Sequence, residues 1–220
     1  MYVPEHFAER RAQVLQDLMQ SQPFATLVVL TAQGIVANHL PMLFTPPEPA
    51  ARRESAGTLR GHVARANPVW RDADVQVEAL AVFQGPHGYV SPTWYPSKQS
   101  NSGKVVPTWN YAIVQARGTL RFVDEPGWLL RHVTAQTDAR EGRREERWRV
   151  SDAPAEFIDS LVHSIVGLEL SIRTLTGKWK FSQNRNVADR AGVIDGLTAD
   201  ANVDSTRELL ARRMRDYLPE

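Results

Sequence analysis

Apolar and polar positions alternate with the spacing of β-strands through much of the chain, whereas helical spacing is confined to the two ends and parts of the second half. Residues 5–20 show the helical period after Pro4, which predicts an amphipathic helix. The period then changes. Residues 24–44 hold two runs rich in β-branched residues, and these predict a hairpin that turns at Ala32-Gln33-Gly34, with the glycine in the left-handed position.

Strand signals continue after this hairpin. Residues 45–57 are rich in proline, alanine and charge, and we predict an exposed loop there rather than a linker between domains. Further strands are predicted over residues 58–64, 78–84, 109–123 and 165–172, the last of them ended by Thr176-Gly177. Together these segments predict a compact, mainly antiparallel β core.

The second half adds helices around this core. Asp124 is placed to cap a helix from Glu125 to Ala139, and Ser151 or Asp152 is placed to cap a second one. The spacing places Trp128, Leu129, His132 and Val133 on one face of the first helix. Ser205 to Glu208 form a capping box, so C-terminal helices are expected over about residues 186–218. We therefore predict a mainly β fold with peripheral helices, built as a single domain over residues 1–220.

The composition is that of an ordinary globular protein. The 220 residues are 42% hydrophobic and 23% charged, and the formal net charge of +1 supplies no strong field for a polyanion such as DNA. Cysteine is absent, which excludes disulfides and cysteine-ligated metals. The N-terminus lacks the apolar core of a signal peptide, and no apolar run approaches membrane-spanning length. We expect a cytoplasmic protein with no membrane contact.

Familiar catalytic and metal-binding motifs are missing. The chain has no Walker A string, no GxGxxG after a strand, no HExxH and no GxSxG, and its six histidines show no metal-ligand spacing. We therefore expect no metal site, and no catalytic residue is evident.

Polar residues gather instead at predicted strand ends, a pattern that suits a phosphorylated ligand. Arg65 lies just past a strand, and an arginine fork is the donor that a phosphate prefers, although one such arginine is often only a solvated surface charge. The run from Lys178 to Arg185 is also rich in donors, although Asn184 or Asn186 could simply cap the next helix. Two Pro-Thr-Trp clusters, 92–94 and 107–109, could stack a flat ligand or close the core.

A set of motifs in this order resembles the PaiB-type FMN-binding negative transcriptional regulators. The motifs are MYVPEHF, NHLPMLF, GHVARANPVW, FQGPHGYVSPTWY, VPTWNY and KFSQNRNVADRAGVIDGL, and they cover nearly the whole chain. That family is similar to pyridoxamine 5′-phosphate oxidase in its FMN-binding split barrel. The resemblance implies FMN as the cofactor and a homodimer with the flavin at its interface.

The resemblance also implies which residues hold the flavin. A first set would lie along the isoalloxazine ring or form the phosphate-binding turn: His39, Leu40, Pro41, Met42, His62, Ala64, Arg65 and Asn67. A second set would approach the flavin from the partner subunit or close the pocket near the ring or ribityl chain: Trp109, Asn110, Tyr111, Lys180, Ser182, Gln183 and Arg185.

The chain departs from the family pattern in the lengthened loop 97–105 and in the Arg/Glu-rich segment 138–149. The function expected from the resemblance is a negative transcriptional regulator or flavin-dependent sensor. No helix-turn-helix is visible, so DNA binding rests on the resemblance alone. A small FMN-dependent oxidoreductase that uses NAD(P)H, and a heme-binding or heme-degrading split-barrel protein, remain as alternatives.

Overall fold

The computed structural model describes residues 1–48, 55–100, 102–199 and 204–218. These residues form two compact units. Unit 1 comprises Met1–Leu18, Gln84–Val114 and Thr176–Glu220, and unit 2 comprises Met19–Phe83 and Gln115–Leu175. The strands β6, β7 and β8 contribute residues to both units, and each unit is described by itself below.

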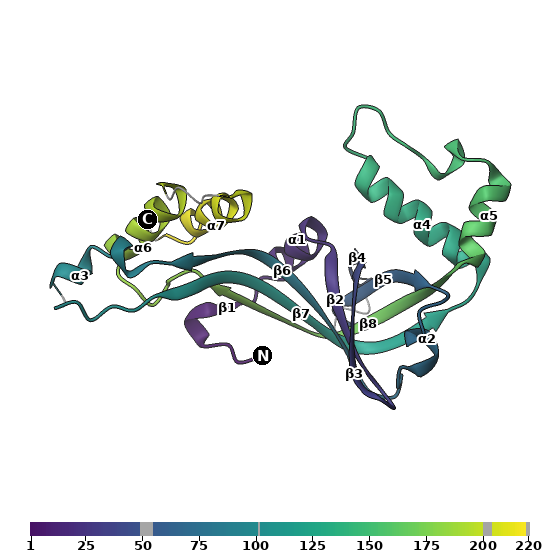
Figure 1. The fold of residues 1–220 in the computed structure, drawn as a ribbon, viewed down its shortest axis with the longest axis horizontal. Coiled ribbons are helices and arrows are strands. Elements are labelled where there is room, and N and C mark those ends of the chain that lie inside the picture. The colour runs from purple at the N-terminus through teal and green to yellow at the C-terminus, as the bar shows by residue number, and fades with distance from the viewer. Residues whose placement is uncertain (49–54, 101, 200–203, 219–220) are drawn as a thin grey trace. The chain divides into compact units, whose positions relative to one another are not determined.

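The strands follow the order β3-β2-β6-β7-β8-β5-β4 in one sheet, and β1 pairs with β8 (Figure 1). The bounds of the strands are β1 Ala8–Glu9, β2 Phe24–Thr31, β3 Gly34–Pro41, β4 Leu43–Thr45, β5 Gly57–Ala64, β6 Ala79–Val90, β7 Thr108–Val123 and β8 Ile165–Lys180. The pairs β2–β3, β2–β6, β4–β5, β5–β8 and β1–β8 are all antiparallel. This confirms the predicted antiparallel β core.

The β2–β3 hairpin of unit 2 turns where the sequence predicted. Gly34 has a φ of 116°, a conformation that only glycine adopts without strain. Alternate residues of β2, among them Ala25, Leu27 and Val29, are buried in the core. The opposite face of the hairpin is open, because Phe24 and Ile35 are 67% and 79% exposed.

Helices cover part of the sheet in unit 2. They are α2 (Val69–Asp72), α4 (Pro126–Glu141) and α5 (Ala155–His163), with the short helix η4 (Val150–Asp152) between the last two. Figure 1 shows α4 and α5 joined by a long connection. The indole of Trp128 on α4 lies directly over Gly167 of β8, where a Cβ would come within 2.3 Å of its Cζ3 atom.

Unit 1 is built around the remaining parts of β6, β7 and β8. Its helices are η1 (Glu5–Phe7), α1 (Ala12–Ser21, up to Leu18), η3 (Pro92–Trp94), α3 (Ser97–Ser100), α6 (Val187–Ala199) and α7 (Ser205–Arg215). The helices α6 and α7 pack against β6, since Leu197 and Leu210 both approach Gly88. Trp94 lies against Gly192 and Gly196 of α6, so this tryptophan anchors the unit's helices.

Three predicted elements have the wrong bounds. The strand predicted over residues 78–84 continues as β6 to Val90. The N-terminal helix begins at Ala12 and not at residue 5, because Ala8 and Glu9 pair with Lys178 and Gly177 as a short strand. The strand β8 does not stop at Thr176-Gly177 but continues to Lys180. Glycine is needed there, since the backbone oxygen of Glu9 and the side chain of Leu15 would lie 2.9 and 2.3 Å from a Cβ at position 177.

Several predicted caps are also wrong. Helix α4 begins after Glu125, and the side chain of Asp124 does not cap it. Ser151 and Asp152 lie within η4, so neither caps α5. The N-cap of α7 is Asp204, which accepts a hydrogen bond from the backbone of Arg207. Asn186 does cap α6, because its side-chain oxygen accepts from the backbone N–H of Asp189 at 2.8 Å.

Of the loops singled out by the sequence, residues 49–54 and residue 101 lie outside the described part of the chain. Ser97–Ser100 form α3 within the lengthened loop. None of the helices among the described residues has both the length and the apolar character needed to cross a bilayer.

Candidate functional site

Arg65 lies immediately after β5, in the turn that the sequence indicated. Its guanidinium donates to both carboxylate oxygens of Asp124, at 2.7 and 2.5 Å. The Nε and Nη2 atoms also donate to the backbone oxygens of His163 and Ile165. The guanidinium holds the pKa of Asp124 below its ordinary value through this hydrogen bond. Arg65 is therefore presented as an anion-binding fork whose present partner is a carboxylate of its own chain.

The same turn brings two asparagines together. Asn67 Nδ2 donates to Asn38 Oδ1 on β3 at 2.8 Å, and Asn67 Oδ1 accepts from the backbone N–H of Val69. The Nδ2 atom of Asn38 is buried and has no hydrogen-bond partner among the described residues. A buried donor without a partner is unfavourable, so this amide would gain from an acceptor that reaches it. Ala64, the last residue of β5, is exposed beside this turn.

His62 is half-buried, and α4 packs against it. Its Nδ1 atom lies 3.2 Å from Nε2 of His132, and the ring of His132 stacks on Trp128. His132 is 3% exposed, and its Nδ1 atom has no hydrogen-bond partner in the part of the chain that the structure describes. Burial, with the nearby His62 and Arg60, lowers the pKa of His132 to about 4, and burial also lowers the pKa of His62. Both rings are therefore neutral at pH 7.

The residues predicted along the flavin ring alternate between two faces. His39 is exposed, and its Nδ1 lies 3.0 Å from the hydroxyl of Thr26. Pro41 is exposed on the same face, and its backbone oxygen accepts from Gln136. Leu40 and Met42 are buried in the core of unit 2 instead. Of these four residues, only His39 and Pro41 are therefore accessible to a ligand.

The second predicted set lies in unit 1, where Trp109 stands on an exposed aromatic face. Trp109 is 48% exposed, and its ring stacks on His87 with centroids 5.9 Å apart. The ammonium of Lys180 donates to the hydroxyl of Thr108 and to the backbone oxygen of Trp109, and burial lowers its pKa. Tyr111 lies under the ammonium of Lys178.

The rest of this set packs within the unit. Asn110 is 0% exposed and donates to the hydroxyl of Ser182 and to the sulfur of Met214. Ser182 has a φ of 62°, which is uncommon for a residue with a side chain. Gln183 bonds to the backbone of Phe181 and Trp179, and Arg185 lies over the ring of Tyr95. In this chain, these groups shape the loop after β8.

The sequence analysis did not assign Asp124 and His132 to the site, although they contact the predicted site residues Arg65 and His62. Asp124 was taken for a helix cap, because an acidic residue before a helical pattern usually is one. His132 was placed only on a shared helix face. The signal for each lies in long-range packing, across 59 residues from Arg65 to Asp124 and across 70 residues from His62 to His132. Motif spacing in a single sequence does not reveal contacts between residues that are this far apart along the chain.

The comparisons with known proteins agree on the family. Residues 1–174 match the family described as "Putative FMN-binding domain". The protease synthase and sporulation protein PAI 2 of Bacillus subtilis is 31% identical over 219 residues, which are 99% of this chain and 98% of that protein. An uncharacterized protein of Aspergillus fumigatus is 34% identical over 239 residues, with 90% of each chain covered.

Solved structures agree on the fold. The flavocytochrome Anf3 from Azotobacter vinelandii superposes with a TM-score of 0.54 at 11% identity, and the match covers 81% of this chain and 72% of that one. At this identity the likeness concerns the fold alone, and it confirms the predicted mainly β, split-barrel class. The family match spans more than half of the sequence, so the chain belongs to the PaiB-type family of FMN-binding domains.

Proposed function

We propose that this protein binds FMN as a homodimer and acts as a flavin-dependent regulator or sensor. Family membership supports the flavin. The observation that carries the proposal is structural: unit 2 combines an arginine fork just after β5, an amide donor on β3 that has no partner among the described residues, and a broad, exposed apolar sheet face.

The donors of Arg65, just after β5, and of Asn38, on β3, fit a phosphate. A phosphate monoester accepts paired hydrogen bonds from a guanidinium, as the Asp124 carboxylate does now. Asn38 Nδ2 adds a donor that no group of the described chain satisfies. FMN binding at this turn would have its phosphate replace Asp124 on Arg65. Arg65 and Asn38 would then hold the phosphate, with Asn67 positioning Asn38.

The open face of the β2–β3 hairpin fits a second copy of the chain. Phe24 and Leu30 on β2 face the same way as their partners Pro41 and Ile35 on β3, and His39 lies among them opposite Thr26. Monomeric proteins rarely leave such a contiguous apolar face in water. A two-fold axis would place the same face of a second copy on it, which is how most homodimers form.

His39 and the exposed Pro41 would then line the ring of FMN at this interface. Bound FMN supplies hydride and single-electron transfer at its ring. Trp109, with its exposed face stacked on His87, is the residue of the second set best suited to contact a flat ring, and we propose it as a contact from the partner copy.

Reconstitution with FMN and with riboflavin tests the phosphate end. We expect Arg65→Ala to weaken FMN retention about tenfold and to leave riboflavin binding nearly unchanged, because only FMN carries the phosphate. Arg71→Ala is the matched control, since Arg71 is exposed in α2 and its guanidinium lies over the ring of Trp70. Equal losses of both flavins in the Arg65 variant would contradict the assignment.

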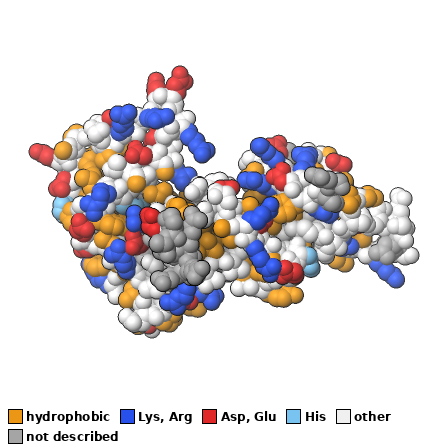
Figure 2. Space-filling model, turned by 180° about the vertical axis from the view of Figure 1, so that it is seen from behind, with side chains coloured by type: hydrophobic (Ala, Val, Ile, Leu, Met, Phe, Trp, Pro, Cys, Tyr) orange, Lys and Arg blue, Asp and Glu red, His pale blue; other side chains and the backbone are white. Residues whose placement is uncertain are grey.

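The regulatory role is tested separately. Acidic and basic side chains are interspersed on the face shown in Figure 2, which offers no broad basic surface for the phosphates of DNA. A regulator of this kind would bind DNA weakly without a specific site. An electrophoretic shift at physiological salt should therefore separate the upstream DNA of its own gene from an unrelated duplex. Equal, weak binding of the two duplexes would leave a flavin-dependent sensor without direct DNA contact.

A further inference from the structure

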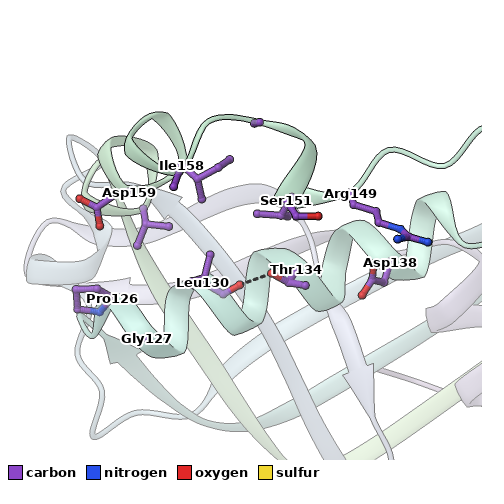
Figure 3. Close-up of a pocket in the computed structure, with 13 residues that line it drawn as sticks. Pro126, Gly127, Leu130, Thr134, Asp138, Arg149, Ser151, Ile158 and Asp159 are labelled. Atoms are coloured by element: carbon purple, nitrogen blue, oxygen red, sulfur yellow. Dashed lines mark hydrogen bonds between the residues drawn. The ribbon is translucent and has the colours of Figure 1, made fainter.

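The helices α4 and α5 enclose a second candidate site in unit 2, with a volume of about 960 Å³. We call it the α4–α5 cavity. One side is the face of α4 that carries Leu130, and the other comes from η4 and from Ile158 and Val162 of α5 (Figure 3). None of the residues proposed for FMN lines it. A cavity of this size with mostly apolar walls is typical of a site for an organic molecule.

Charged groups stand at the two ends of the α4–α5 cavity. Figure 3 shows Arg149 and Asp138 at one end, and Asp159 near Pro126 at the other. Asp159 also lies 3.5 Å from His163. The cavity thus has apolar walls, with a guanidinium and a carboxylate together at one end and a single carboxylate at the other.

The Arg149 end is close to neutral. Arg149 also lines a smaller neighbouring cavity, together with Arg144, Arg147, Glu145 and Asp152. Arg144 in turn pairs with Glu141 at 3.3 Å. This balance does not attract a polyanion such as a nucleotide, but the fork of Arg149 suits a single planar carboxylate. The Asp159 end suits an ammonium group.

The length of the cavity fixes the size of its ligand. Its α4 wall runs from Pro126 to Asp138. At ~1.5 Å per helical residue this wall is about 18 Å long. An extended peptide advances roughly 3.3 Å per residue, so about five residues span it. Apolar side chains on such a peptide would contact Leu130, Ile158 and Val162.

We propose that the α4–α5 cavity binds a short apolar peptide of about five residues with free ends, its ammonium at Asp159 and its carboxylate at Arg149. This site is independent of the flavin. It would give the protein an input other than the state of FMN.

Isothermal titration of the whole chain with the pentapeptide Ala-Val-Ala-Leu-Ala tests this proposal. We expect binding of the free-ended peptide, and about tenfold weaker binding when either its N-terminus is acetylated or its C-terminus is amidated. Arg149→Gln should weaken the free-ended peptide about tenfold and leave the amidated one unchanged. Asp159→Asn should weaken the free-ended peptide about tenfold and leave the acetylated one unchanged.

Arg143→Gln serves as the matched control, because Arg143 is an exposed arginine of the same segment that lines neither cavity. Ile158→Glu should abolish peptide binding while FMN retention stays at the wild-type level. Absence of heat at millimolar peptide would overturn the proposal, as would equal affinity for the capped and free peptides. Binding of decanoate without binding of the peptide would assign the cavity to a fatty anion. Peptide binding by a preparation that retains no FMN would uphold this inference and count only against the flavin.

Discussion

At the scale of single residues, Arg65 is a strand-exit arginine with a carboxylate already on its fork. The sequence predicted its position after a strand. Its guanidinium donates two hydrogen bonds to one carboxylate, and a phosphate could accept the same pair. The pairing of Asp124 with Arg65 could not be predicted from the sequence, because a single acidic residue before a helix is more simply interpreted as a helix cap. The hydrogen bonds to the His163 and Ile165 backbones also make Arg65 a tie between chain segments of unit 2.

Asp124→Asn should strengthen FMN binding. The change removes the negative charge that competes for Arg65, so a phosphate no longer has to displace it. We expect the dissociation constant for FMN to fall by about three- to tenfold while that for riboflavin stays constant. Quenching of flavin fluorescence in a titration measures both. Glu125→Gln is the control, since Glu125 is the neighbouring acid and its partner is Arg131. Weaker FMN binding in the Asp124→Asn variant would mean that the ion pair organises the turn for the phosphate.

At the scale of elements, the packing of α4 on β5 and β8 could not be predicted from the pattern of apolar and polar residues. The spacing of Trp128, Leu129 and His132 predicted a helix face, but not what the face covers. Gly167 explains the packing, because its lack of a side chain is what lets the Trp128 indole come close to β8. Likewise, the continuation of β8 past Gly177 depends on the close approach of Leu15, which no local signal records.

Gly167→Ala should destabilise unit 2. The new methyl group would meet the Trp128 indole at 2.3 Å and the Leu129 side chain at 3.1 Å, so the helix must shift. Overpacking of this kind costs about 1–3 kcal/mol of unfolding free energy. Urea denaturation measures the loss. Adding Trp128→Leu to the Gly167→Ala variant should restore part of it, because the smaller side chain gives room. Additive losses in the double variant would show that the two residues do not meet.

The His62–His132 pair should make the protein less stable in mild acid. Burial beside His62 and Arg60 lowers the pKa of His132 to about 4, so between the ordinary histidine value and pH 4 only the unfolded chain takes up this proton. The contribution of neutral His132 to the free energy of unfolding is therefore fully present above about pH 6.5. It declines toward pH 4, by about 3 kcal/mol in all. The lowered pKa of His62 acts in the same direction.

Urea denaturation at pH 7 and pH 5 measures this slope. His132→Leu should flatten it, whatever the variant's absolute stability. His163→Gln should keep it, because His163 is exposed and is bonded to Asp159 of its own helix. An unchanged slope in the His132→Leu variant would place the acid sensitivity elsewhere.

At the scale of the whole molecule, the strand pattern predicted the class of the fold but not its path. The hairpin at Gly34 and the long strand β7 follow from period and turn chemistry. The neighbours β8 and β5 are about a hundred residues apart, and their pairing rests on packing that a single sequence does not display. The same holds for the division into two units that share three strands.

The proposed homodimer depends on the open β2–β3 face, and Ile35 is its most exposed large apolar side chain, at 79%. Ile35→Glu would place like charges near each other across a two-fold interface and bury them unpaired. We expect dimer dissociation to become at least about a hundredfold easier, and FMN retention to fall with it, while the circular dichroism of the chain stays unchanged. Light scattering after gel filtration at a fixed protein concentration measures the oligomer. Val106→Glu is the control, because Val106 is a similarly exposed apolar residue of unit 1 that lies outside the β2–β3 face. An Ile35→Glu variant that remains dimeric and keeps FMN would move the interface to another surface. One that becomes monomeric but keeps FMN would separate the flavin from the dimer, and the phosphate turn at Arg65 would then have to hold FMN within a single copy.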